Sequence, residues 1–209
     1  DESVEVDVVL VAVGRGPVTD GIGLDATRVQ VDRGFIQVDP ATMQTAEPGI
    51  YAVGDVVAGV PQLAHAGFAE GIAAITHIAT GTTAPVDYRA IPLVVYTHPE
   101  VASVGLTEEQ ATEAGYDVEK HDHGMAGVGR AIIKGQTQGM VKIVAQKDGP
   151  ILGATVVGPS AGELIHELMY AVGWEALPSE AAALPSVHSP PVSNACSHPL
   201  WNRSTRPPN

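Results

Sequence analysis

Cysteine is nearly missing from this chain of 209 residues, in which Cys196 stands alone. A single cysteine cannot form a disulfide within the chain, so we expect a protein of the reducing cytoplasm. Aromatic residues make up only 4% of the chain, and Val, Ile, Leu and Ala must therefore fill its core. With 44% hydrophobic and 17% charged residues, the composition is that of a folded globular protein.

Basic residues are also scarce, with 11 Lys and Arg against 24 Asp and Glu and a net charge of −13. Nucleic acids and anionic membrane surfaces are bound by clustered Lys and Arg, so neither is expected as a partner. No apolar run approaches the roughly 20 residues of a membrane-spanning helix. The chain opens with an acidic segment and not with the basic and apolar regions of a signal peptide.

The first part of the chain has the pattern of short strands followed by one helix. Residues 8–14 form an apolar run that ends at a glycine, which predicts a buried strand. No methionine precedes this strand, and we therefore expect further sequence upstream. Residues 35–38 and 49–53 predict two more short strands, bounded by turns that contain Pro or Gly. The Ala- and Ile-rich residues 65–80 predict a buried helix that a glycine closes.

The pattern changes after a linker at residues 81–85. Strands are predicted at residues 92–95, 101–104, 139–146 and 151–157, and helices begin at the capping-box residues Thr107 and Ser160. We divide the chain into an α/β segment of residues 1–86, an α+β domain of residues 88–184 and an irregular tail of residues 185–209. The α+β domain is expected to contain an antiparallel sheet with flanking helices.

A glycine and an acid follow the predicted strand at residues 49–53. Gly54 allows a ligand to approach the backbone closely, and Asp55 can accept hydrogen bonds from hydroxyl groups. Ligands of open α/β sheets bind at the carboxyl ends of strands, where this pair would lie. A Gly–Asp pair by itself is most often an ordinary turn, so the surrounding sequence must decide between the two interpretations.

Residues 45–55 resemble the motif that closes the flavin domain in the pyridine nucleotide–disulfide oxidoreductases. Residues 61–71 resemble the start of this family's helix beneath the flavin, and residues 11–15 resemble the strand end where its chain leaves the nicotinamide domain. Residues 94–108 closely resemble the start of the dimerisation domain in the family's dihydrolipoamide dehydrogenases, and motifs within residues 139–165 continue it in order.

This resemblance implies a fold and a parent activity. Residues 1–86 would be the C-terminal remnant of a region that binds FAD and NAD(P), and residues 88–184 would be a dimerisation domain that pairs two subunits of a homodimer. The parent activity would be the NAD-dependent oxidation of dihydrolipoyl groups. The partner would be a lipoyl-bearing protein of a 2-oxoacid dehydrogenase complex.

The same resemblance implies specific cofactor contacts. Asp55 would hydrogen-bond the ribityl chain of FAD, beside the open backbone of Gly54. Gly14 would lie near the nicotinamide dinucleotide. The flavin would be contacted, largely through backbone groups, by Gln62, Leu63, Ala64 and His65.

Several parts of the family's chemistry are missing from this sequence. The family uses a Cys-x4-Cys pair beside a Gly-rich phosphate loop for FAD, and a second Gly-rich loop for NAD. None of the three is found here, and Cys196 has no partner. We therefore expect that the chain alone does not turn over lipoamide.

The family's acid–base motif is also altered. Family members carry a His-x-His-Pro segment and, four residues after its second histidine, a glutamate that orients this histidine. If His188 is the first histidine, Pro190 replaces the second, and Asn194 or Ala195 replaces the glutamate. His188 is thus a weak catalytic candidate, and one hypothesis is that the tail from about residue 185 is an altered terminus.

Four other motifs are interpreted as structural or accidental. Residues 21–26 match a dinucleotide-binding pattern, but no strand precedes them and no helix follows. The pair His121 and His123 has no third ligand nearby, so we expect a solvated loop and no metal site. Residues 98–100 mark the entry strand of the dimerisation domain, and His166 is interpreted as an interface or surface residue.

Two alternatives stay open at this point. One is a related flavoenzyme that resembles mercuric or glutathione reductase. The other is a non-catalytic dimerisation or binding module that uses the second sheet and the helix at residues 160–173. Whether the chain is itself an enzyme is therefore not decided by its sequence.

Overall fold

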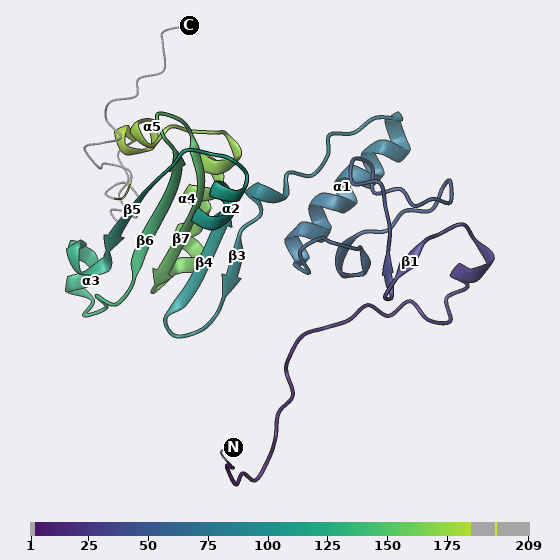
Figure 1. Ribbon diagram of the computed structural model, residues 1–209, viewed down its shortest axis with the longest axis horizontal. Coiled ribbons are helices and arrows are strands. Elements are labelled where there is room, and N and C mark those ends of the chain that lie inside the picture. The colour runs from purple at the N-terminus through teal and green to yellow at the C-terminus, as the bar shows by residue number, and fades with distance from the viewer. Residues whose placement is uncertain (1–2, 185–194, 196–209) are drawn as a thin grey trace, which may run out of the picture. The chain divides into compact units, whose positions relative to one another are not determined.

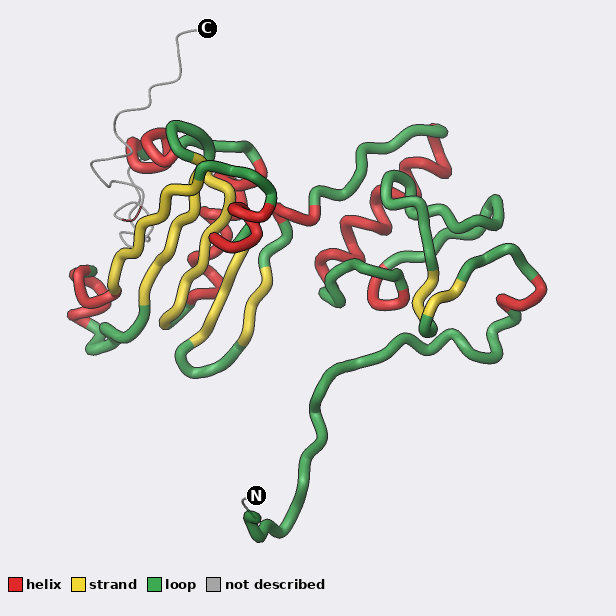
Figure 2. Tube along the Cα trace, in the orientation of Figure 1, coloured by secondary structure: helices red, strands yellow, loops and turns green. Residues whose placement is uncertain are grey.

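The computed structural model describes residues 3–184 and residue 195. The chain divides into two compact units, Asp1–Val86 and Asp87–Asn209. Figures 1 and 2 show the helices and strands of both. Within the described ranges, no helix has the length and apolar character needed to cross a bilayer.

The first unit is built around one long helix. Its elements are η1 (Leu24–Ala26), β1 (Val31–Asp32), β2 (Phe35–Ile36), η2 (Gly54–Val56) and α1 (Ala64–Thr80). The predicted helix at residues 65–80 is confirmed by α1, which ends where Gly81 adopts a left-handed φ of 77° and donates to the carbonyl of His77. The expectation that this helix is buried is wrong for one side of it, where Phe68 and Ile72 are exposed. A small hydrophobic cluster of Ile36, Ala52 and Val57 packs beside the short hairpin.

The strand predicted at residues 8–14 is wrong for this structure. These residues form no strand, and the exposed fractions of Val8, Leu10 and Val13 are 81%, 86% and 93%. A strand is stabilised by hydrogen bonds to its neighbours, and no such neighbour is found among the described residues of this unit. The predicted strand at residues 49–53 is likewise reduced to a single bridge between Gln44 and Tyr51.

The second unit contains a five-stranded antiparallel sheet in the order β3-β4-β7-β6-β5. The strands are β3 (Leu93–Val95), β4 (Glu100–Gly105), β5 (Val118–Gly124), β6 (Met140–Gln146) and β7 (Ile151–Gly158). The helices are η3 (Tyr88–Ala90), α2 (Glu108–Glu113), η4 (Met125–Gly127), α3 (Gly129–Ile133), α4 (Ala161–Gly173) and α5 (Pro178–Ala183). The α+β prediction is confirmed, with the helices flanking the sheet (Figure 1).

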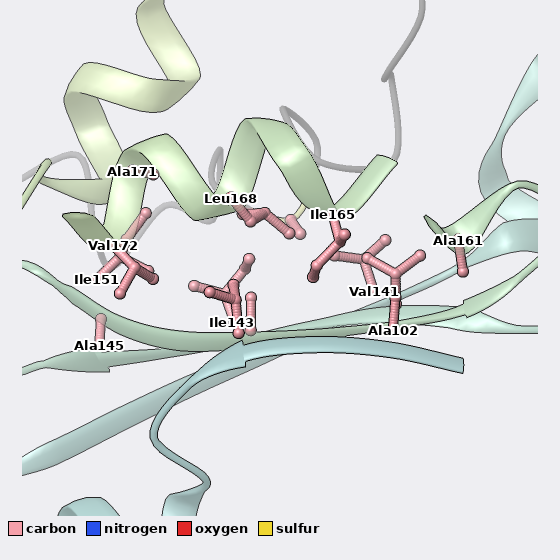
Figure 3. Close-up of a cluster of buried hydrophobic side chains, with 14 of the residues drawn as sticks. Ala102, Val141, Ile143, Ala145, Ile151, Ala161, Ile165, Leu168, Ala171 and Val172 are labelled. Atoms are coloured by element: carbon pink, nitrogen blue, oxygen red, sulfur yellow. The ribbon is translucent and has the colours of Figure 1, made fainter. Parts of the chain in front are cut away.

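The main core lies between α4 and one face of this sheet, as Figure 3 shows. Ile165 and Leu168 of α4 point toward Ile143 of β6, and all three side chains are fully buried. Burial of one such side chain is worth about 1.5–3 kcal/mol. Val141, Ile143 and Ala145, at every second position of β6, belong to the core under α4, whereas Val144 lies in a separate buried cluster.

The two predicted capping boxes have different outcomes. The hydroxyl of Thr107 accepts a hydrogen bond from the backbone N–H of Gln110, and the backbone N–H of Thr107 donates to the side-chain oxygen of Gln110. The predicted capping box at α2 is therefore confirmed. Ser160 makes no side-chain cap. Its φ is 61°, and the carboxylate of Glu100 instead accepts from the N–H of Gly162 at 3.1 Å.

The other face of the sheet is joined to α2 by the buried hydrophobic residues Ala111, Val144 and Leu152 and by one acidic residue. Glu108 accepts hydrogen bonds from Lys120 at 2.8 Å and from Lys142 at 2.9 Å. Lys120 and Lys142 hold the pKa of the Glu108 carboxyl below its ordinary value, and Glu108 raises the pKa of Lys120. This cluster ties α2 to β5 and β6 through charge.

We expect this cluster to make stability depend on pH. Because the folded-state pKa of Glu108 is lowered, its contribution is present above the unfolded pKa of about 4.3 and is lost as pH falls through the folded pKa. In Glu108→Gln, unfolding free energy measured by urea titration should therefore fall less steeply below about pH 5 than in the wild type. Glu113→Gln, on the same helix, is the control, and an equal slope in wild type and Glu108→Gln would contradict this role.

Candidate functional site

The turn at Gly54 and Asp55 presents a carboxylate at the surface of the first unit. Gly54 has a left-handed φ of 75°, which a side chain would strain. The Asp55 side chain is 51% exposed. Asp55 is thus held in a short 3-10 turn with its oxygen atoms open to a ligand that donates hydrogen bonds.

Helix α1 contacts this turn on its buried side. The N–H of Gly54 donates to Oε2 of Glu70 at 2.5 Å, and Glu70 is fully buried. The backbones also approach closely, because a Cβ added to Gly67 would lie 3.2 Å from the Cα of Gly54. From the sequence, Glu70 was recognised only as part of the 61–71 motif and neither residue was given a role, although a single acid in a helix of Ala and Ile was a usable signal.

The rest of the 45–55 motif is anchored at two further points. The guanidinium of Arg28 donates to Glu47 from Nε at 3.1 Å and holds the pKa of this carboxyl below its ordinary value. The hydroxyl of Tyr51 lies 2.9 Å from Nδ1 of His77 on α1. The motif is therefore held to α1 at Tyr51 as well as at Gly54.

The predicted flavin contacts at residues 62–65 lie at the start of α1. Leu63 is the residue before the helix, and its side chain makes no capping hydrogen bond. Ala64 and His65 are exposed in the first turn. The Gln62 side chain donates to the carbonyl of Asp55 at 3.3 Å, which joins this segment to the turn.

Arg15 connects the 11–15 motif to the same place. Its Nη2 donates to the carbonyl of Gln62 at 3.1 Å, and its Nη1 lies 3.8 Å from the carboxylate of Asp55. Both side chains are exposed, so the ion pair contributes little stability. Gly14, with a φ of 133°, precedes this arginine, and its place near a nicotinamide dinucleotide stays a prediction.

The structure also locates the motifs that were set aside. Glu100 accepts from the N–H of Gly162, which agrees with a structural role for residues 98–100. The expectation of a loop at His121 and His123 is wrong, because both lie on the edge strand β5. Within the described residues, no group of three His, Cys, Asp or Glu could hold a metal ion.

Of the remaining predictions, those at residues 21–26 and at His166 fall on described residues. Residues 21–26 contain the short η1 and no strand before it, as expected of a chance match to the dinucleotide pattern. His166 is exposed on α4. His188 and Cys196 lie outside the described residues.

Two family matches cover most of the chain. Residues 91–199 match the dimerisation domain of the pyridine nucleotide-disulphide oxidoreductases. Residues 1–71 match a second sequence family, described as pyridine nucleotide-disulphide oxidoreductase. The chain therefore belongs to the pyridine nucleotide-disulphide oxidoreductases.

Within this family the chain is similar to dihydrolipoyl dehydrogenases. It is 49% identical over 173 residues to that of Thermus scotoductus, a match that covers 82% of this chain and 37% of the relative. It is 42% identical over 196 residues to the mitochondrial enzyme of Canis lupus familiaris, covering 93% of this chain and 38% of the relative. The crystal structure of LpdA from Mycobacterium tuberculosis is similar at a TM-score of 0.79 and 29% identity, covering 87% of this chain and 40% of that one. The chain thus spans less than half the length of these relatives.

Two glycines of α1 test how tightly the helix meets the Gly54 turn. Ala is favoured over Gly in a helix by about 0.8–1 kcal/mol, and an added Cβ at Gly71 meets nothing within 4 Å. Gly71→Ala should therefore stabilise α1 against local opening, measured by amide hydrogen exchange of its residues. Gly67→Ala should give a smaller gain or a loss because of its contact with Gly54. Equal gains in the two variants would show that the contact imposes no constraint.

Proposed function

We propose that this chain supplies the flavin-sugar contacts and the dimerisation domain of an NAD-dependent dihydrolipoyl dehydrogenase. The observation that carries the proposal is the open carboxylate of Asp55, held on a turn that α1 supports from below. The motif order and the similarity to dihydrolipoyl dehydrogenases support the same activity. The branch related to mercuric or glutathione reductase is less well supported, since these similar proteins carry the dihydrolipoyl dehydrogenase name.

The residues at this site fit a sugar chain of FAD. A carboxylate accepts hydrogen bonds from hydroxyl groups without needing a cation, and Asp55 is half exposed. Asp55 and the backbone of residues 62–65 would hold the cofactor. When bound, FAD carries electrons from a dithiol to NAD.

The chain's own residues do not complete this chemistry. A dithiol needs two cysteines, and Cys196 is the one cysteine in the 209 residues. The acid–base candidate His188 is followed by Pro190 where the family motif has a second histidine. Neither proline nor asparagine transfers protons at neutral pH. We therefore propose that the chain alone does not oxidise dihydrolipoyl groups.

An exposed aromatic pair supports pairing of two copies. Tyr170 of α4 and Trp174, the residue that follows this helix, are 53% and 75% exposed, and their ring centroids lie 5.0 Å apart. Tyr and Trp are enriched at the centres of protein interfaces, where they supply much of the binding energy. We propose a homodimer formed through this domain, with a lipoyl-bearing protein of a 2-oxoacid dehydrogenase complex as the outside partner. The single cysteine favours a cytoplasmic location.

Removing the exposed ring should weaken the dimer without unfolding the domain. Trp174→Ala should raise the dimer dissociation constant by about 30-fold or more, the effect of losing a hot-spot residue. Sedimentation equilibrium of the full chain measures this constant. The control is Ile133→Ala, an apolar residue that is 86% exposed on α3. A dimer equally stable in both variants would contradict a role for this face of α4.

The flavin assignment is tested in a chimera. This chain is placed after the upstream portion of the Thermus scotoductus relative, and bound flavin is measured by visible absorbance. We expect the chimera to bind FAD and Asp55→Ala to raise the FAD dissociation constant about 10–150-fold, as expected for losing one hydrogen bond to a charged group. The control is Asp25→Ala, an acidic residue of η1.

Two outcomes would contradict the proposed function, the first at its flavin site and the second at the inactivity of the chain alone. One is a dimeric, folded chimera that lacks flavin, which would favour the alternative of a non-catalytic dimerisation module. This alternative stays open because the chain has no cysteine pair. The other outcome is NADH production from dihydrolipoamide by the isolated chain with added FAD.

A further inference from the structure

The buried surface of α1 contains one residue that does not fit a purely apolar core. The helix buries Ala66, Ala73 and Ala74, and beside these it buries Glu70 with no exposed surface. Burying a carboxylate is costly unless hydrogen bonds compensate for the lost water. A methionine of similar size would avoid that cost. The buried Glu70 therefore calls for a partner that donates a hydrogen bond to it.

That partner is the peptide N–H one residue before Asp55. Oε2 of Glu70 accepts from the N–H of Gly54 at 2.5 Å. Gly54 is in the left-handed region, where glycine has more conformations available than any other residue. The hydrogen bond and the contact with Gly67 together restrict this freedom from the buried side. The Asp55 side chain leaves the same turn on the exposed side.

We propose that Glu70 is a positioning residue for the FAD sugar site, acting through the peptide of Gly54 to hold Asp55 in its binding conformation. This inference rests on the proposed function, because it assumes that Asp55 binds the flavin's sugar chain. A ligand that meets an ordered carboxylate does not have to order it, and pre-organisation of this kind increases affinity. Glu70 is too deeply buried to contact the ligand itself.

The first test measures FAD affinity in the chimera described above. Glu70→Met keeps the side-chain volume and removes the acceptor, and it should raise the FAD dissociation constant by about 10-fold or more. Glu70→Gln keeps a carbonyl oxygen that can accept from Gly54, and it should stay within about threefold of the wild type. Affinities are measured well below the melting temperature of each variant, so that a general loss of stability does not enter.

The second test separates positioning from a merely structural role. If Glu70 acts through Asp55, Glu70→Met should cost much less FAD affinity in an Asp55→Ala background than in the wild type. A purely structural Glu70 would lower affinity by the same factor in both backgrounds, and that result would overturn the proposal.

The amide of Gly54 gives a readout that needs no flavin. In the full 209-residue chain, the Gly54 amide proton should exchange slowly and resonate downfield, and Glu70→Met should abolish both properties while Glu70→Gln keeps the protection. Loss of FAD binding by the unsubstituted chimera would overturn the proposed function and the positioning role with it. Equal FAD binding by all variants would overturn the positioning role alone.

Discussion

The approach of α1 to the Gly54 turn is the contact on which the candidate site depends. It combines the hydrogen bond from the Gly54 N–H to Glu70 with the close backbone contact at Gly67. Tyr51 and His77 add a third link between the same motif and the same helix. Because α1 also begins at the segment predicted to touch the flavin, one helix fixes both halves of the site. The exposed Asp55 follows from this arrangement, since the turn is held from its buried side.

The first unit leaves apolar surface uncovered within its described residues. On α1 the side chains of Phe68, Ile72 and Ile75 are 75%, 67% and 59% exposed. Apolar patches of this kind mark interaction surfaces or partners that are not in view. The dihydrolipoyl dehydrogenases that this chain matches are more than twice its length. The second unit, by contrast, closes its main core between α4 and its own sheet.

Local signals were predicted well from the sequence. The capping box at Thr107 and the glycine stop of α1 depend on neighbours a few residues away, and both were confirmed. The antiparallel sheet also followed from apolar alternation and turn residues. The 45–55 motif could be recognised because its residues are contiguous, while the binding role of its exposed Asp55 stays a prediction.

Predictions failed where the structure depends on residues that are distant in the sequence. The strand at residues 8–14 needs partner strands, which no local pattern supplies. The edge strand β5 carries polar residues on both faces, so its alternation was hidden, and Ser160 was displaced as a cap by Glu100 from another strand. Glu70 was recognised only as part of the 61–71 motif, and its contact with Gly54 was missed because the two residues are 16 positions apart.

The central claim is that Asp55 binds the sugar chain of a flavin, and a crystal structure of the FAD-loaded chimera tests it most directly. The account predicts a carboxylate oxygen of Asp55 within hydrogen-bonding distance of a ribityl hydroxyl, with the Gly54 N–H still bound to Glu70. A flavin whose ribityl chain lies elsewhere, with Asp55 facing solvent alone, would contradict it.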